Sequence, residues 1–421
     1  MSNNIVIGSG LSVLGFLNKN NSKNFLIYEK NNYVGGHAKS HMVDKFYFDE
    51  GAHISHSKNE QFYQQILKDK KKILNQFKSS VLNFKNSKEI GYPIQLHLRD
   101  LNFSERFKIL SEVFEKTKFQ NPNNYYEWLI SNYGFFLTEN YYQPYTKKYW
   151  RSDPKTMDIN WVKGRLAKKN INKTLFSLFF KNKKTNLVYD EFRYPKEGGF
   201  FELFRSHYEN KNIKLNSKIT KINLKKKSII INNTKEVFFE NLISSIPLVD
   251  YKYLIPELDT KIKLDLDNFK FTSLIIYNFK IKKKIKLNFQ WCYFYDEDID
   301  VSRMSIINNF NQSENHDDYY IVQMEVFRRN DETIDEFSID KNVKNHLINF
   351  FKIEKKHIYF ENKFFVEKAY PVPIIGVEEK RLKIIEYLKN HNIYQIGLYG
   401  KWKYMWSDQS FLDGYNFDHE N

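Results

Sequence analysis

The feature that most constrains the fold stands at the start of the chain, in the stretch "NNIVIGSGLSVLGFLNKN", residues 3 to 20. A short apolar run, Ile5 to Ile7, ends in a glycine turn, and a helical pattern follows at once. Gly8 permits the tight turn, and Gly10 lets the backbone approach a pyrophosphate at the helix N-terminus, where unpaired N–H groups and the helix dipole favour anions. Strand, glycine turn and helix in this order predict a dinucleotide-binding α/β domain.

The third glycine position of this motif holds Val13, and Gly15 follows two residues later. A glycine there normally lets the helix pack close to the strand. We therefore expect Val13 to push the helix outward or to require a smaller partner on the sheet, which is a packing cost and removes no phosphate contact. A second strand, "NFLIYEK", brings Glu29 about twenty residues after the glycines, where an acidic side chain accepts from ribose hydroxyls.

The next residues extend the motif. The segments "YEKNNYVGGHAKS" and "FYFDEGAHISHSKNE" resemble flavin-binding proteins of the amine oxidase and protoporphyrinogen oxidase type. In that superfamily the acid-ending strand is followed by a Gly-Gly turn, here Gly35 and Gly36, and then by a hairpin leading to an acidic-Gly-x-His segment near the flavin. His37 stands where an arginine is commonest. The resemblance implies that the cofactor is FAD.

Further segments resemble one branch of this superfamily, the UDP-galactopyranose mutases and their relatives. They are "GAHISHSKNE", the Pro-Tyr-x-x-Lys-x-Trp core at 144–150, a Trp-x-x-x-Arg helix at 161–165, "FRYPKEGGFFELF" at 192–204 and the C-terminal "NIYQIGLYGKWKYMWSDQSFLDGY". Two departures matter: "NLISSIPL" at 241–248 ends in a Ser-x-Pro turn like that of the oxidases, and the final turn differs. In the mutases the final turn carries Gly-Arg, whose arginine grips the diphosphate of the substrate, whereas here Gly397 is followed by Leu398.

The resemblance implies a set of site residues. Those implied to hold FAD are Gly8, Gly10, Leu11, Ser12, Glu29, Lys30, Gly36, His37, Ala38, Gly51, His53, Ile54, Ile219, Gly397, Ser407 and Gln409. Those implied to act in catalysis are His56, Arg303 and Tyr404, and those implied to bind substrate are Trp150, Arg165 and Tyr194. Arg165 and Arg303 would suit a phosphate or carboxylate through their forked donors.

Four of these residues also have a structural alternative. Arg165 could be a charge on a helix surface, Trp150 and Tyr194 could be core aromatics, and His56 could hydrogen-bond a helix N-terminus. No metal site is predicted, because the only close pair of candidate ligands, His53 and His56, has no cysteine or matched carboxylate to complete it.

The implied fold class is α/β: a Rossmann-like FAD-binding domain of the GR2 type, interleaved with a helical insertion and a mostly antiparallel substrate domain. Residues 1–58, 186–250 and 391–421 would form the FAD-binding domain, 59–185 a mostly helical region, and 251–390 the antiparallel sheet. Alternation of polar and apolar residues in "KFTSLIIYNFKI" and "YYIVQMEVF" supports strands in that last part.

Composition limits the partners. The formal charge of +16 fits an anionic partner, but the basic runs are short and far apart, which favours solvated faces. We expect a small-molecule substrate, with an anionic group as one option, and no nucleic acid; contact between a basic face and a membrane surface stays open. No apolar run reaches the roughly 18 residues of a membrane helix. The sequence does not predict the oligomeric state.

A single cysteine, Cys292, excludes an internal disulfide and indicates a reducing compartment. Its place in the strand-like run "QWCYFYDE" predicts a small buried core residue. The N-terminus enters a strand at once, which leaves no room for a signal peptide. The predicted location is therefore the cytoplasm.

Three functional hypotheses follow. The first is a FAD-dependent oxidoreductase of the amine oxidase superfamily, in which flavin N5 takes a hydride from the substrate. The second is an isomerase like UDP-galactopyranose mutase, acting with reduced FAD on a sugar or nucleotide sugar without net redox change. The third is a flavoprotein that only binds. The missing arginine at Leu398 favours the first.

Overall fold

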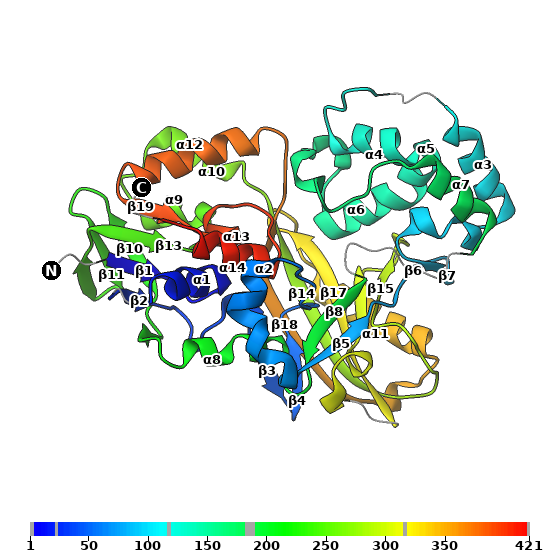
Figure 1. Cartoon of the computed structure of the whole chain (residues 1–421), viewed down its shortest axis with the longest axis horizontal. Helices are drawn as coiled ribbons and strands as arrows, with labels where there is room; N and C mark the ends of the chain where they lie inside the picture. The colour runs from blue at the N-terminus through cyan, green and yellow to red at the C-terminus, as the bar shows by residue number, and fades with distance from the viewer. Residues whose placement is uncertain (1–3, 22–23, 116–118, 182–189, 315–317, 419–421) are drawn as a thin grey trace.

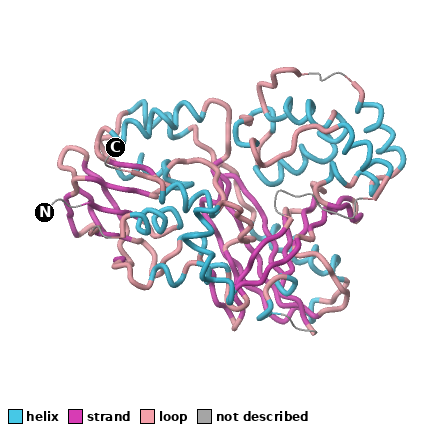
Figure 2. Tube along the Cα trace, viewed as in Figure 1, coloured by secondary structure: helices cyan, strands magenta, loops and turns pink. Residues whose placement is uncertain are grey.

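The structure is a computed structural model that describes residues 4–21, 24–115, 119–181, 190–314 and 318–418. Figure 1 shows three parts: a sheet beside the N-terminus, a sheet of long strands, and a cluster of helices between residues 103 and 179. The same view coloured by secondary structure separates the helical cluster at one end from the strand-rich remainder (Figure 2). The predicted boundary between residues 185 and 186 lies outside the described residues, and the five-segment division stays a prediction.

The first sheet has five strands, all parallel to their neighbours. In spatial order they are β19 (Ile393–Gln395), β13 (Asn241–Ser244), β1 (Asn4–Ile7), β2 (Leu26–Tyr28) and β9 (Ile213–Lys214). They come from three distant stretches of the chain. β1 and β13 are almost fully buried, as expected of central strands in a parallel sheet that is covered on both faces. The predicted Rossmann-like α/β fold is confirmed.

Smaller elements surround this sheet. They are the hairpin β3 (Ser40–Val43) and β4 (Phe46–Asp49), the antiparallel sheet β10 (Ile219–Asn223), β11 (Ser228–Ile231) and β12 (Lys235–Phe238), and the helices α1 (Leu11–Lys19), α8 (Arg205–Tyr208), α9 (Tyr251–Leu254), α10 (Thr260–Asp267), α12 (Val377–Lys389), α13 (Gly397–Gly400) and α14 (Ser407–Tyr415). In Figure 1, α1 and α14 lie side by side.

Val13 is accommodated on the sheet side of α1. It is fully buried in a cluster with Val6, Ile27 and Ile243, which are branched side chains and not the smaller partner that we expected. On the opposite side of the helix, glycines allow two helices to pack closely. A Cβ on Gly15 would stand 2.0 Å from the carbonyl oxygen of Phe411, and one on Gly414 would stand 1.7 Å from that of Ser12. The glycines thus bring α1 against α14 and leave the helix–sheet contact to Val13.

The second sheet has seven strands. In spatial order they are β18 (Ile358–Pro371), β14 (Phe271–Lys282), β17 (Tyr319–Arg329), β16 (Arg303–Ile306), β15 (Trp291–Phe294), β6 (Val81–Lys85) and β7 (Lys88–Gly91). Every neighbouring pair is antiparallel except β15 with β6. The predicted antiparallel sheet is therefore confirmed, with two strands added from the region predicted to be mostly helical. Cys292 on β15 is fully buried, as predicted, and burial raises the pKa of its thiol well above the usual value.

Apolar side chains of α11 (Glu336–Phe351) cover one face of this sheet. The pair β5 (Leu74–Lys78) and β8 (Glu191–Pro195) lies beside it, and the short α2 (Glu60–Phe62) follows the first flavin-like segment.

The helical cluster consists of α3 (Phe103–Val113), α4 (Tyr125–Tyr133), α5 (Phe135–Leu137), α6 (Gln143–Trp150) and α7 (Ile171–Phe179). Three of these helices begin alike: the side chains of Asn102, Asn124 and Asn170 each accept from the backbone N–H three residues on. The helix expected over 161–165 is wrong. A 3-10 turn ends at Val162, because Gly164 lies at φ +76° and turns the chain away.

Within the described residues, no helix combines the length and the apolar character needed to cross a membrane.

Candidate functional site

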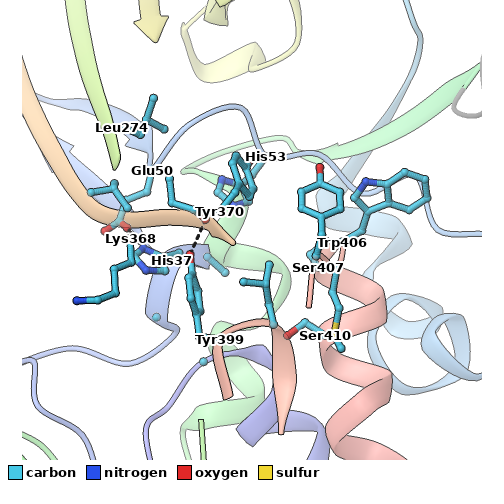
Figure 3. A pocket seen from close by; sticks show the side chains of 18 of the residues that line it. His37, Glu50, His53, Leu274, Lys368, Tyr370, Tyr399, Trp406, Ser407 and Ser410 are labelled. Carbon is cyan, nitrogen blue, oxygen red and sulfur yellow. Dashed lines mark hydrogen bonds and ion pairs between the residues drawn. The ribbon is translucent and has the colours of Figure 1, made fainter. Parts of the chain in front are cut away.

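A cavity of about 1040 Å³ runs from the glycine turn after β1 to aromatic side chains of the helical cluster and the seven-stranded sheet. This volume is at the upper end of the roughly 300–1,000 Å³ seen for ligand pockets. Figure 3 shows part of its wall: Trp406, Ser407 and Ser410 lie on one side, and His37, Glu50 and Lys368 on the other. The cavity is large enough for a dinucleotide and a second small molecule together.

One end of the cavity is made of backbone, and we call it the glycine cradle: Gly8, Ser9, Gly10, Gly35 and Gly36. Gly10 precedes α1, whose N-terminus has no side-chain cap and no acidic residue in its first turn. A Cβ placed on Gly10 would meet no atom within 4 Å, so the space beside these N–H groups is open. The N–H of Gly35 donates to the carbonyl of Ser9 at 3.0 Å, which holds the two glycine turns together. This arrangement suits a pyrophosphate.

Glu29 follows β2 at the rim of the cradle and is buried. One carboxylate oxygen accepts from the hydroxyl of Ser9 at 2.7 Å, and the other accepts from the backbone N–H of Asn31 at 2.8 Å. These bonds fix the carboxylate at the cavity wall. Because each oxygen has a second acceptor site, Glu29 can still receive a ribose hydroxyl.

His37, at the position where an arginine is commonest, is hydrogen-bonded to a carboxylate. Its Nδ1 donates to one oxygen of Glu50 at 2.6 Å, and Nε2 of His41 donates to the other oxygen at 2.7 Å. Burial alone would raise the pKa of Glu50, but the two imidazoles outweigh it and lower that pKa to about 2. His37 is thus oriented by Glu50 at the cavity wall. Glu50 itself was not predicted as a site residue.

The cradle, the fixed acid and the open space fit an FAD, which these residues would hold. The predicted cofactor residues that line the cavity are Gly8, Gly10, Leu11, Ser12, Glu29, Lys30, Gly36, His37, Ala38, His53, Ile54, Ile219 and Ser407. Gly51, Gly397 and Gln409 are absent from the lining. A Cβ on Gly397 would stand 2.3 Å from the hydroxyl of Ser12, so this glycine permits close packing behind the wall.

The other end of the cavity is an aromatic chamber. Its members are Tyr125, Tyr142, Tyr145, Tyr149, Trp150, Trp161, Tyr293, Tyr295, Tyr370 and Tyr404. The ring of Tyr404 lies 5.4 Å from that of Trp150 and 5.3 Å from that of Tyr370, both in edge contacts. Burial, assisted by Tyr370, raises the pKa of Tyr404 to about 12. The Tyr404 hydroxyl therefore keeps its proton at neutral pH and can donate a hydrogen bond to a ligand.

Arg165 lines the chamber, but much of its guanidinium is engaged by the protein. Nη1 donates to the carbonyl of Trp161 at 2.7 Å, and Nη2 donates to the carbonyl of Tyr404 at 3.0 Å. The guanidinium carbon also lies 4.7 Å from the ring centre of Tyr404 and 5.3 Å from that of Trp406, within cation–π range. Arg165 is therefore neither on a helix nor a freely solvated charge, and it joins the helical cluster to the segment before α14.

Arg303 is paired still more tightly. Its Nε and Nη2 make three hydrogen bonds of 2.7–3.0 Å to the carboxylate of Glu325, whose side chain is almost fully buried. Burial alone would lower the pKa of Arg303, but Glu325 raises it well above the usual value. Glu325 also accepts from the backbone N–H of Ala52 at 2.9 Å. Arg303 thus stands at the cavity wall with its charge balanced.

His53 and His56 both line the cavity. His53 lies 5.3 Å from the ring of Phe200, and His56 contacts Trp406 edge-on at 4.7 Å. Burial lowers the pKa of both imidazoles. Both are therefore neutral at pH 7, which leaves each able to accept a proton.

Tyr194 lies outside the cavity lining, unlike the other predicted substrate residues, Trp150 and Arg165. It is almost fully buried, and its hydroxyl donates to Asp49 at 2.6 Å. Asp49 also accepts from the backbone N–H of Phe200 at 3.0 Å. Tyr194 is thus a core residue that fastens β8 to the β3–β4 hairpin, which is the structural alternative stated for it.

Sequence reasoning missed Glu325, Tyr149, Tyr293 and Tyr370. The sequence did contain a signal for Glu325, because an acid in the middle of the apolar strand "YYIVQMEVF" requires a buried partner. It contained no signal that these tyrosines belong to a site, since tyrosine is common throughout this chain. Across the described residues, no three His, Cys, Asp or Glu side chains are grouped so that they could hold a metal ion.

Comparison with known proteins identifies similar folds. Residues 6–69 match the family model described as an NAD(P)-binding Rossmann-like domain. The fold is similar to that of reduced UDP-galactopyranose mutase, at 20% identity and a TM-score of 0.89, over 99% of this chain and 94% of that chain.

Two oxidases share the fold. A protein provisionally named protoporphyrinogen oxidase, from Exiguobacterium sp. 255-15, is 12% identical with a TM-score of 0.74, over 98% of this chain and 97% of that chain. Putrescine oxidase bound to putrescine is 11% identical with a TM-score of 0.61, over 98% and 97%. The chain therefore has the fold of the mutase and of these oxidases, and the predicted resemblance is confirmed in its fold.

Proposed function

We propose that this chain is an FAD-dependent oxidoreductase that acts on a small molecule. The observation that carries the proposal is a single cavity that joins the glycine cradle to the aromatic chamber. When bound, FAD would supply the redox chemistry, by accepting a hydride from a C–H bond of the substrate, such as one beside an amine nitrogen. Gly10 and the start of α1 would hold the pyrophosphate, and Glu29 the ribose.

The residues of the chamber would bind and orient the substrate. Tyr404 and its neighbours offer ring faces and protonated hydroxyls, which suit a compact ring or an amine with few charges. His53 and His56, neutral at pH 7, are the candidates to accept a proton from the reacting group. The closely packed aromatic walls would exclude water from the reacting atoms.

The state of the two arginines supports an oxidoreductase over an enzyme that handles a nucleotide diphosphate. Arg303 is neutralised by Glu325, and Nη1 and Nη2 of Arg165 bind backbone carbonyls. At the final turn, Leu398 lines the cavity where the mutases carry an arginine. A doubly charged diphosphate entering the chamber would thus lose its hydration and find few cationic donors free to replace it.

A mutase-like isomerase is the second candidate, acting on a sugar with reduced FAD. It is supported by the likeness to the mutase along nearly the whole of both chains. It is also supported by the juxtaposition of Trp150, Arg165 and Tyr404, which are three of the residues implied by the resemblance to that branch.

One experiment separates the candidates. Purified protein loaded with FAD is mixed anaerobically with panels of amines, reduced ring compounds and nucleotide sugars, and flavin bleaching is followed with product analysis. The oxidoreductase proposal expects bleaching by at least one compound together with its oxidised product. Isomerisation that appears only after prior reduction with dithionite would support the mutase instead, and neither bleaching nor turnover would leave a flavoprotein that only binds.

A further inference from the structure

Six phenylalanines lie exposed at the outer end of the helical cluster, and we call them the phenylalanine patch. They are Phe103, Phe107 and Phe114 on or beside α3, and Phe176, Phe179 and Phe180 on or beside α7. Each is between 53% and 76% exposed. Soluble proteins scatter single exposed apolar residues over their surface, but a group of this kind marks a contact surface.

The patch spans two helices that pack together. Phe103, Phe107 and Phe114 share one stripe of α3, because they are spaced four and seven residues apart, while Ile109 and Val113 face the core. The guanidinium of Arg106 donates to the carbonyl of Leu178 at 3.3 Å and holds α3 against α7. Figure 1 shows the two helices side by side at the edge of the molecule.

The surroundings of the patch are basic. Residues 163–181 contain no Asp or Glu, and within them Lys163, Lys168, Lys169, Lys173 and Lys181 are all exposed. Two carboxylates of α3 are turned away, because Glu105 accepts from the hydroxyl of Tyr141 at 2.9 Å and Glu112 accepts from the backbone N–H of Phe136 at 3.0 Å. Glu115, after the end of α3, is the exposed acid nearest to the patch along the chain.

Aromatic rings flanked by lysines have the chemistry of a bilayer-binding surface, in which rings enter the headgroup region and lysines attract anionic lipids. A second copy of the chain fits less well, since a two-fold contact would set the same lysines against one another. We propose that the phenylalanine patch docks this chain onto an anionic membrane surface. The surface is independent of the cavity and of the reaction proposed for it.

The test is sedimentation of the full chain with phosphatidylcholine vesicles, with and without phosphatidylserine. We expect binding that requires phosphatidylserine and weakens as salt rises. The variant Phe103→Ser/Phe107→Ser/Phe179→Ser should bind at least tenfold more weakly. In Lys168→Gln/Lys169→Gln/Lys173→Gln each lost charge should weaken binding about fivefold.

Matched controls lie elsewhere in the molecule. Lys225→Gln/Lys226→Gln/Lys227→Gln removes three exposed charges from the turn between β10 and β11, and Phe337→Ser removes a phenylalanine that is 81% exposed at the start of α11. Both controls should bind vesicles as the parent does, and thermal unfolding should show that all variants fold. Three results would each overturn the proposal. The controls could weaken binding as much as the patch variants do, or binding could be the same with and without phosphatidylserine. The parent could also fail to bind vesicles and instead form a dimer that the serine variant dissociates.

Discussion

The glycine cradle and the aromatic chamber are two ends of one cavity, and they are built by opposite means. In the cradle, backbone N–H groups face open space, and almost no side chain is needed beyond Glu29 and Ser9. In the chamber, rings and hydroxyls from six separate stretches of chain form the wall, and its arginines are largely engaged by the protein. A site made of backbone can bind a widely shared chemical group, such as a pyrophosphate, with little dependence on the neighbouring side chains. A site made of side chains determines which substrate is accepted.

The largest effect is expected from a variant that fills the cradle. Gly10→Val places a side chain where no protein atom lies within 4 Å, at φ −72°, which any residue adopts. We expect the fold to be unchanged and FAD affinity to fall at least about hundredfold, through loss of two charged hydrogen bonds. Flavin fluorescence on titration measures the affinity, and unchanged binding would remove the pyrophosphate from this position.

The second test addresses the paired charge in the chamber. Glu325→Gln leaves Arg303, whose side chain is only 11% exposed, without its counter-charge and should reduce the free energy of unfolding by about 3–5 kcal/mol. The double variant Arg303→Met/Glu325→Gln should recover part of that loss, because no charge is left unpaired and the amide can still accept from Ala52. Urea unfolding of the three proteins gives the values. A double variant less stable than Glu325→Gln would contradict the conclusion that Glu325 neutralises Arg303.

The third test asks whether the packing of α1 on the sheet affects FAD binding. Val13→Ala removes two methyl groups from a fully buried cluster and should cost about 2 kcal/mol of stability. Its FAD affinity should equal that of the parent, since Val13 lies behind the cradle and not in the cavity wall. A large loss of affinity in this variant would show that the cradle depends on the helix–sheet contact.

The fourth test uses pH. Lys148 on α6 is buried, where it donates to the carbonyls of Phe294 and Asp296, and burial lowers its pKa from 10.5 to about 7 despite the nearby Asp296. Between about pH 7 and pH 10.5 Lys148 is therefore protonated in the unfolded chain and largely neutral in the folded one. The free energy of unfolding should rise with pH in this range, by up to about 1.4 kcal/mol per pH unit. Lys148→Met should lose this slope, and identical slopes for both proteins in urea unfolding would contradict it.

The cradle could be predicted from the sequence because strand, turn and helix are local, and glycine spacing has a direct backbone meaning. The chamber could be predicted only in part. Arg165, Arg303 and Tyr404 came from resemblance, yet the partners that fix the two arginines come from other segments: the Tyr404 carbonyl binds Arg165, and Glu325 neutralises Arg303. Tyr194 belonged to a well-matched segment, but the direction of its side chain depends on Asp49 across the hairpin. Likewise, the close approach at Gly15 depends on Gly414, about 400 residues away along the chain.

We propose that the cradle holds FAD although Val13 and His37 depart from the usual pattern. The measurement that decides this is the visible absorption spectrum of the freshly purified protein, before and after dithionite. We expect oxidised-flavin bands that bleach on reduction, or that develop once FAD is added. A colourless protein that takes up no FAD would contradict it and would leave the cavity without its proposed cofactor.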